Sequence, residues 1–475
     1  MNLHKRLSAL CVAVMLLIGS LILPAAAADP QIHWRGTFAH QENNAVVTAP
    51  LPSDPDRVEQ VWSEKVGNNT VVIVDDTVYT YDGVNTDSYG SYGDGGTFYK
   101  LDAETGDVLR SVDCKYGTRF YYSYSVYANG MIYVGCPTAI MAFDPETCAP
   151  IWTYEHLNAE WWYPTLQYVN GCIVSNGTVL DADTGEVVAT ITAPKWGAGW
   201  SNGVEVGGRF YVADATESLY EIDTTTWNAT CVWASGYTAA TSCGGVMYYD
   251  GALYWGGVSG NFHRISLETD EVDTVDANIK CYGTPVACNG RVYVAGMAPN
   301  DNETNTGPIT IGVYAAKDFS KIYQTDNGIN GKIQGTPILA VTGSGSVRIY
   351  VQAYTKPGEV YYLEDSSSKT GGKQVKLLTP DQENFAWEQL ACDQEGALYV
   401  TNDNGYLMKY RTAPFSGGDV NHDDVVNGDD AALLSQYIAQ WNVKISKDQA
   451  DTNGDGSIDI ADLIVLRRYL ANWYS

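Results

Sequence analysis

The 475-residue sequence predicts an all-β propeller followed by a small all-α calcium-binding module. Three observations lead to this fold class. A unit of about forty residues, rich in Gly, Asn, Thr and Tyr, recurs along the middle of the chain. The same region shows almost no helical periodicity. Near the C-terminus, two oxygen-rich loops of twelve residues are each followed by a segment with the apolar spacing of a helix.

The chain begins with the pattern of a secretory signal peptide. Lys5 and Arg6 precede an apolar stretch at 7–23, and small residues follow up to Ala28, so we expect cleavage near Ala27 or Ala28. No other stretch approaches about 18 consecutive apolar residues, so we expect no membrane span in the mature chain. The expected order is signal peptide 1–28, N-terminal segment 29–56, propeller 57–413, short linker 414–418 and calcium module 419–475.

The composition is strongly acidic, with 56 Asp and Glu against 28 Lys and Arg and a formal net charge of −28. Removing the signal peptide makes the balance more negative, because it takes away two positive charges. Nucleic acids and anionic membranes attract basic surfaces, so neither is an expected partner. The charge suits an extracellular protein that must stay dispersed.

Cysteine pairing is left open by the sequence. Ten cysteines are present, without the close spacing of a zinc site, and an odd number follows the signal peptide. Cys136 with Cys148, or Cys281 with Cys288, could bridge hairpins. Buried free thiols are the alternative.

The repeated unit consists of a turn, an apolar strand ending near a tyrosine, a short polar loop and a further strand ending in aspartate. Asn-Gly and Asp-Gly turns between alternating apolar runs are strong hairpin signals. Successive copies lie between 37 and 57 residues apart, which suits one four-stranded blade each and favours eight blades over seven. The copies align on Tyr79, Tyr133, Val174, Tyr211, Tyr254, Tyr293, Tyr350 and Tyr399.

A second motif is expected to join the third and fourth strands of a blade. It occurs at 101–106, 143–148 and 180–185, with a weaker copy at 223–226. Its aspartate can accept backbone N–H groups and its glycine can adopt positive φ. With these turns and its Thr-Pro entries, the region resembles the PQQ-like (quinoprotein-type) β-propeller repeat. Residues 58–62 have the pattern of a detached outer strand, so we expect both ends of the propeller to complete one blade.

The resemblance to quinoprotein repeats does not imply the quinone. Dehydrogenases of that family typically have a vicinal cysteine pair and a catalytic aspartate in a calcium–quinone site, and this sequence has no Cys-Cys. PQQ is therefore not an expected cofactor. Since one fold serves many functions, the ring is expected to act as a binding or assembly scaffold.

Aromatic residues gather in the segments that join one blade to the next. Such connections share one face of a propeller, where aromatic rings could stack on sugars. The candidate glycan-binding residues are Trp161, Trp162, Trp196 and Trp200, and packing between blades is the alternative. Glycoside cleavage would need two carboxylates about 5–9.5 Å apart. The sequence cannot pair the acidic residues near these segments, so the catalytic residues remain unknown; the acids are Glu155, Glu160, Asp214, Glu217, Glu383 and Glu388.

The C-terminal loops carry ligands for two calcium ions. Calcium takes six to eight oxygens, and alternate residues of a twelve-residue loop can point at one cation, with position 7 giving a backbone carbonyl. The expected ligands are Asp419, Asn421, Asp423, Val425, Asn427 and Asp430 in the first loop, and Asp451, Asn453, Asp455, Ser457, Asp459 and Asp462 in the second.

The segment after each loop is duplicated as well, with 431–441 aligning on 463–473 without gaps. Apolar residues at helical spacing from Leu433 to Trp441 predict one buried stripe. No helix fits before the first loop. Residues 419–475 therefore resemble a type I dockerin, the module that plugs cellulosomal proteins into cohesin domains of a scaffold. The resemblance implies cohesin contacts at Gly428, Asp429, Ser435 and Gln436 in one half and Ile460, Ala461, Arg467 and Arg468 in the other.

The two halves differ in ways that matter for binding. Position 6 of the loop, where the chain turns sharply, is Gly456 in the second loop but Asp424 in the first. The first loop should therefore bind calcium more weakly. One cohesin-contacting surface is polar and acidic and the other apolar and basic, which predicts a single docking mode.

The sequence thus predicts a secreted, dockerin-bearing propeller of a cellulosome-type complex, either free or at the cell surface. It should dock onto a scaffold cohesin with calcium and bind plant or other polysaccharide without catalysis. The alternative is a propeller-fold glycoside hydrolase or polysaccharide lyase.

Overall fold

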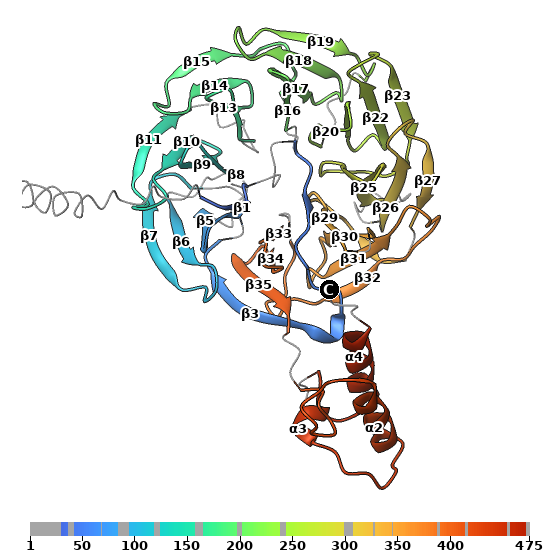
Figure 1. Cartoon of the computed structure of the whole chain (residues 1–475). Coiled ribbons are helices and arrows are strands. Elements are labelled where there is room, and N and C mark those ends of the chain that lie inside the picture. Colours follow the sequence, from blue (N-terminus) through green and yellow to red (C-terminus); the bar gives the residue numbers. More distant parts are fainter. Residues whose placement is uncertain are drawn as a thin grey trace, which may run out of the picture. The chain divides into compact units, whose positions relative to one another are not determined.

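The computed structural model describes residues 30–36, 42–67, 69–83, 95–117, 124–156, 165–196, 202–237, 244–298, 307–325, 328–343, 345–386, 390–413, 417–453 and 457–471. Within the unit His33–Ser475, eight sheets of four or five strands form a ring (Figure 1). The prediction of an eight-bladed β-propeller is confirmed.

The first four blades follow one another along the chain. Blade 1 contains β1 (Ile32–Trp34), β4 (Val72–Val74), β5 (Thr77–Gly83), β6 (Gly96–Asp102) and β7 (Val108–Cys114). Blade 2 contains β8 (Tyr124–Ala128), β9 (Met131–Cys136), β10 (Ala139–Phe143) and β11 (Pro150–Glu155). Blade 3 contains β12 (Gln167–Val169), β13 (Cys172–Ser175), β14 (Thr178–Asp181) and β15 (Val187–Thr190). Blade 4 contains β16 (Val204–Val206), β17 (Arg209–Ala213), β18 (Leu219–Asp223) and β19 (Ala229–Trp233).

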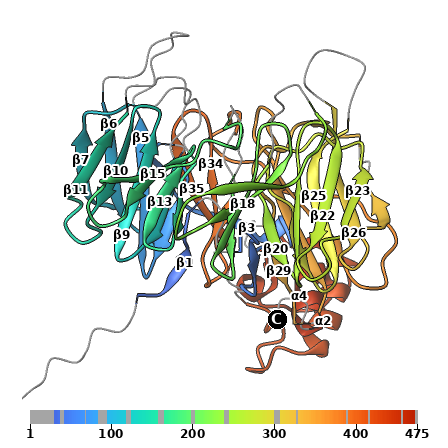
Figure 2. The ribbon, with the colours of Figure 1, turned by 90° about the horizontal axis from the view of Figure 1, so that it is seen from above.

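The other four blades complete the ring, and Figure 2 shows their strands standing side by side. Blade 5 contains β20 (Met247–Tyr249), β21 (Ala252–Gly256), β22 (Asn261–Ser266) and β23 (Val272–Asp276). Blade 6 contains β24 (Val286–Cys288), β25 (Arg291–Met297), β26 (Gly307–Ala315), β27 (Lys321–Gln324) and the short β28 (Asn330–Gly331). Blade 7 contains β2 (Val46–Val47), β29 (Ile338–Val341), β30 (Val347–Gln352), β31 (Val360–Asp365) and β32 (Val375–Leu378). Blade 8 contains β33 (Ala391–Cys392), β34 (Leu398–Thr401), β35 (Tyr406–Thr412) and β3 (Val58–Lys65).

Both ends of the propeller build blade 8, as the sequence predicted. The outer strand β3 pairs antiparallel with β35 from Val58 opposite Thr412 to Lys65 opposite Tyr406. The start of the propeller thereby supplies the outer strand that covers the edge of β35 and holds the ring closed. The 3-10 helix η1 (Pro55–Arg57) leads into β3.

An N-terminal strap, residues 42–57, runs along the inner edges of several blades. The side-chain amide of Asn43 donates to the carbonyls of Gly203 and Val246 at 2.6 and 2.9 Å, at the inner strands of blades 4 and 5. Asn44 exchanges two hydrogen bonds of 2.8 Å with Ala287 of blade 6. β2 then pairs in parallel with β29 of blade 7. The strap therefore links the inner strands of four blades, and the sequence patterns gave no sign of this.

Several of the recurring tyrosines connect neighbouring blades through hydrogen bonds of their hydroxyl groups. All eight aligned positions lie in the second strand of their blades when the additional inner strands β1 and β2 of blades 1 and 7 are not counted. The Tyr79 hydroxyl donates to the Pro145 carbonyl of the next blade at 3.0 Å, and Tyr133 donates to Ala182 at 3.2 Å. Tyr254 makes the same contact with Ala316 at 2.7 Å. These three tyrosines thus bury their rings while their hydroxyls donate to the neighbouring blade.

The predicted turn between third and fourth strands is present with the expected hydrogen bonds. In blade 2 the Asp144 carboxylate accepts from the backbone N–H groups of Glu146 and Thr147 at 3.0 and 2.7 Å. These bonds favour the ionised form and lower the pKa of Asp144. The same pattern recurs at Asp102, Asp181 and Asp223.

Outer strands pack onto these turns with complementary volumes. The Trp152 ring lies over Gly185, where an added Cβ would approach the ring to 2.6 Å, and its indole N–H donates to the Ala182 carbonyl. Trp62 lies over Gly106 in the same way. At the interface between blades 3 and 4 the large and the small residue change places. Here the outer strand carries small Ala189 and the turn carries the buried Trp227, and both belong to one hydrophobic cluster. Glycine at the turn therefore provides room as well as positive φ.

The described cysteines are all free thiols, so unpaired residues, the alternative that the sequence left open, hold for them. Neither candidate bridge, Cys136–Cys148 or Cys281–Cys288, is formed. Burial raises the pKa of Cys281 and of Cys288 to about 12, so both remain protonated at neutral pH.

The C-terminal region is helical. It contains α2 (Gly428–Ile438), the short α3 (Lys447–Ala450) and α4 (Ile460–Leu470). A small core forms between α2 and α4, with Leu434 and Leu466 fully buried. The expected buried stripe is correct at Leu434 but wrong at Trp441, which is 63% exposed because the helix ends at Ile438.

Candidate functional site

The first calcium loop is folded around its own acidic side chains. The Asp419 carboxylate accepts from the backbone N–H of Asp423 and of Asp424, both at 3.0 Å. Asp423 also donates its backbone N–H to Asn421 Oδ1 at 2.9 Å, and the Asn421 amide donates to Asp423 Oδ2. The side chains at positions 1, 3 and 5 therefore lie close together.

The residue at position 12 of each loop is a fully buried aspartate. Asp430 accepts from the backbone N–H of Asn421 at 3.0 Å and of Asn427 at 2.8 Å, so it ties the start of the loop to its end. Asp462 does the same in the second half, accepting from Thr452 and Asp459 at 2.8 Å. A buried carboxylate is costly unless it is paired or hydrogen-bonded. These bonds fix both carboxylates at the loop, where a cation would satisfy them further.

Position 9 of each loop begins the helix that follows. Asn427 and Asp459 are the N-caps of α2 and α4, and each forms a capping box with the aspartate three residues later. A capping box satisfies backbone donors at a helix start that would otherwise be unpaired. Loop and helix therefore fold as one piece, which couples order in the loop to order in the helix.

Two residues of the first loop are held in the left-handed conformation. His422 at position 4 has a φ of +62° and Asp424 at position 6 has a φ of +65°. The corresponding residues of the second loop are glycines, Gly454 and Gly456, which lie outside the described residues together with Asp455. A side chain makes this conformation costly, although Asp and His tolerate it better than most residues.

The donor set fits a calcium ion, because each assigned residue offers hard oxygen, from its side chain or, at position 7, from its backbone carbonyl, and two loops of this length are present. Among the described residues, however, no three His, Cys, Asp or Glu side chains lie close enough together to hold a metal ion by themselves. Binding in the first loop therefore needs amide and carbonyl oxygens, such as those of Asn421 and Val425, in addition to carboxylates.

The eight residues expected to contact cohesin all lie at the start or along α2 and α4. On α4, Ile460 is 58% exposed and Arg467 is exposed, whereas Ala461 and Arg468 are partly buried. Arg468 donates to Asp54 Oδ2 at 2.5 Å. On α2 the equivalents are exposed Gly428 and Asp429 and partly buried Ser435 and Gln436.

Of the candidate glycan-binding tryptophans, the structure describes Trp196 alone. Its indole N–H donates to the Ile191 carbonyl at 2.8 Å, and its ring lies against Gly177, so much of this side chain is used to pack blade 3. Trp161, Trp162 and Trp200 lie outside the described residues.

The acidic residues near the connecting segments fall into different settings. Glu217 is fully buried, and its carboxylate accepts from the Ser259 hydroxyl at 2.7 Å and lies 3.4 Å from His263 Nε2. Asp214 is buried as well and accepts from both the backbone and the hydroxyl of Thr216. Glu155 is exposed beside Lys115, and Glu383 is exposed. Glu160 and Glu388 lie outside the described residues. The two buried acids thus act in blade structure.

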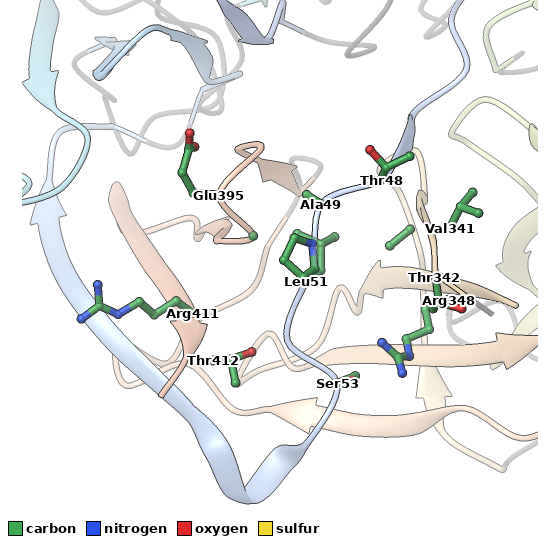
Figure 3. Close-up of a pocket in the computed structure, with 14 residues that line it drawn as sticks. Thr48, Ala49, Leu51, Ser53, Val341, Thr342, Arg348, Glu395, Arg411 and Thr412 are labelled. Atoms are coloured by element: carbon green, nitrogen blue, oxygen red, sulfur yellow. The ribbon is translucent and has the colours of Figure 1, made fainter. Parts of the chain in front are cut away.

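A cavity of about 290 Å³ lies between the N-terminal strap and blades 7 and 8 (Figure 3). Several of its charged groups already have partners in the protein. Arg411 donates to Glu59 at 2.8 Å, and Glu395 lies 3.1 Å from His33 Nδ1. In Figure 3 the charged ends of Arg411 and Glu395 point away from Leu51 at the centre of the view. The charged groups of Arg411 and Glu395 are therefore not directed toward one ligand in this cavity.

Comparison with known proteins agrees with both halves of this description. Residues 417–471 match the dockerin type I domain family. No curated protein matches the sequence significantly. Similar solved structures include BamB from Moraxella catarrhalis, with a TM-score of 0.53, 13% identity and coverage of 74% of this chain and 99% of that one.

Two alcohol dehydrogenase structures are similar as well. A quinohemoprotein alcohol dehydrogenase from Pseudomonas putida has a TM-score of 0.53 and 12% identity, covering 93% of this chain and 95% of that one. A europium-containing methanol dehydrogenase has a TM-score of 0.55 and 10% identity, covering 78% and 89%. At these identities the likeness concerns the fold, which is the PQQ-type propeller.

The chain is therefore an eight-bladed propeller that carries a type I dockerin domain. A type I dockerin implies a cohesin partner, generally binds calcium, and is typical of extracellular cellulosome-type proteins. None of the described helices is long and apolar enough to cross a membrane.

Proposed function

We propose that this protein is a secreted component of a polysaccharide-degrading complex and docks onto a scaffold cohesin when both dockerin loops hold calcium. The observation that carries the proposal is the duplicated unit of loop, buried position-12 aspartate and capped helix. The proposed calcium ligands are the twelve residues assigned in the two loops. Calcium would offset the negative charge of the loop carboxylates, order the loop and thereby fix the helix that it caps.

The propeller is proposed to be a non-catalytic module that binds polysaccharide. Support comes from the sequence, which concentrates tryptophans such as Trp161 and Trp162 in the segments between blades, because sugar faces stack on aromatic rings. The N-terminal strap also occupies the inner edges of blades 4 to 7, which suits a scaffold better than an axial site for PQQ. Asp214 and Glu217, held in the blade structure, are poor candidates for a catalytic pair.

Capture by cohesin tests the docking role. Immobilised cohesin domains are mixed with the full chain in calcium and then in chelator. We expect retention by at least one cohesin in calcium and release by chelator. Retention that ignores calcium, or no retention by any cohesin while calcium still binds, would contradict the proposal.

The polysaccharide role needs a separate assay. Sedimentation with insoluble plant polysaccharides is compared for the wild type and for Trp161→Ala/Trp162→Ala, with Trp196→Phe as a control for packing. We expect the double variant to lose binding and the control to retain it. Equal binding by all three proteins would remove these tryptophans from the proposal.

A further inference from the structure

The outer faces of the two dockerin helices differ in a way that selects one of them for docking. Ile460, Ile464 and Arg467 lie four and three residues apart on α4, which places them on one side of the helix. Ile460 is 58% exposed and Ile464 is 41% exposed. The buried side of α4, with Leu463 and Leu466, faces the core shared with α2. The outward side is therefore an unpartnered apolar stripe that ends in a positive charge.

The same positions on α2 carry no comparable stripe. The duplication aligns Gly428 with Ile460, Ala432 with Ile464 and Ser435 with Arg467. Gly428 and Ala432 are exposed, and Ser435 is partly buried. Two other apolar residues of the first half are exposed, namely Val425 and Trp441, but Val425 lies in the loop and Trp441 beyond the end of α2. Among its described residues, the first half thus lacks large apolar side chains exposed along its helix, where the only equivalent is the small Ala432.

Charge separates the halves further. At loop position 11, exposed Asp429 of the first half corresponds to Ala461 of the second. Within the helices, neutral Ser435 of α2 corresponds to positively charged Arg467 of α4. A partner surface that complements an apolar stripe and an arginine meets no matching groups on α2 and faces the charge of Asp429 instead. Unpaired or like charges at an interface oppose binding to the wrong surface.

We infer that this dockerin docks in one orientation, through α4, onto a cohesin surface with an apolar centre and an acidic rim. The inference rests on the proposed cohesin docking and adds which half binds and what the partner surface contains. Ile460 and Ile464 supply the apolar centre of the contact, because buried anchors contribute most of the binding energy of an interface. Arg467 sits at its edge and steers an acidic partner.

Matched substitutions in the two halves test the inference. The full chain is prepared as I464D and as A432D, which place the same residue at equivalent exposed positions of α4 and α2. A second pair, R467E and S435E, does the same for charge. Affinity for an immobilised cohesin that retains the wild type in calcium is measured by surface plasmon resonance. Calcium stoichiometry and helix content show that each variant is folded.

We expect I464D to weaken binding at least about tenfold, whereas A432D changes it by less than about threefold. R467E should mainly slow association and reduce the effect of salt on that rate, and S435E should not. Losses of similar size in both halves would overturn the inference. So would binding that survives each single substitution and disappears only when I464D and A432D are combined, since either helix would then dock.

Failure of the proposed function gives a different result from failure of this inference. If no cohesin retains the wild type in calcium, the docking role itself is wrong. If the wild type is retained but A432D loses more affinity than I464D, docking stands and the choice of helix is wrong.

Discussion

Replacement of Asp424 by glycine should tighten calcium binding by the first loop. Asp424 occupies position 6 with a φ of +65°, a conformation that costs an ordinary L-residue roughly 1–2 kcal/mol. Glycine removes that strain but gains freedom in the disordered loop, which offsets about 0.5–1 kcal/mol. The net gain is about 0.5–1 kcal/mol. It enters the binding free energy because calcium orders the loop, and it corresponds to roughly two- to fivefold in Kd.

The measurement is calorimetric titration of calcium into Asp424→Gly, with Asp451→Ala in every protein to disable the second loop. Asp424→Asn is the matched control, because it removes the same charge and retains a side chain in the left-handed region. We expect the glycine variant to bind more tightly than the asparagine variant. Equal Kd values for the two would show that the backbone conformation at position 6 does not limit affinity, and the reasoning would be refuted.

Four further outcomes are expected. Gly185→Ala should destabilise the propeller by about 2–4 kcal/mol in urea unfolding, because its Cβ would meet the Trp152 ring, whereas Gly130→Ala, with a similar positive φ and open space, should cost only about 1 kcal/mol. Asp365→Asn should cost about 3–5 kcal/mol in the same assay, since Asp365 is fully buried and pairs with Arg291 at 2.9 Å; Asp273→Asn, at the more exposed carboxylate that pairs with Arg264, should cost less than about 1 kcal/mol. The pKa values of Asp102, Asp144 and Asp223 are lowered below those of the unfolded chain. Their contribution to the stability of the fold is therefore present above about pH 4 and is lost as the pH falls through the folded-state pKa. Asp144→Asn should make the fall of Tm in acid less steep, and an unchanged slope would contradict this. Chelator should lower the helical circular dichroism signal while leaving the propeller's own unfolding transition in place, and simultaneous loss of both would show that the two regions unfold together.

Several features of this protein followed from the sequence because their causes are local. A calcium loop is defined by oxygen residues at fixed spacing, and a blade by a turn, a strand and a tyrosine that recur within a few dozen residues. The detached strand at 58–62 could be assigned to the last blade because that blade lacked one strand. The need for left-handed backbone at position 6 followed from loop geometry, and Asp424 adopts it.

Other features depended on contacts between residues far apart in the chain. The strap interacts through Asn43 with carbonyls about 160 and 203 positions later, and no local pattern predicts such bonds. Trp196 was a candidate for sugar stacking from its position in a connection, but its neighbours Gly177 and Ile191 give it a packing role. Trp441 fitted the helical period, yet the helix ended three residues earlier and left it exposed.

The sequence by itself determined the two modules, the repeat number and the chemistry of the calcium loops, because each is written in short-range spacing. The tertiary structure alone decided which side chains are buried in packing contacts and which are exposed to solvent. Ile464 and Ala432 occupy the same place in a duplicated unit, and both are exposed. Only the packing of α2 against α4 showed that the isoleucine faces outward, because burial depends on what the fold places against a residue.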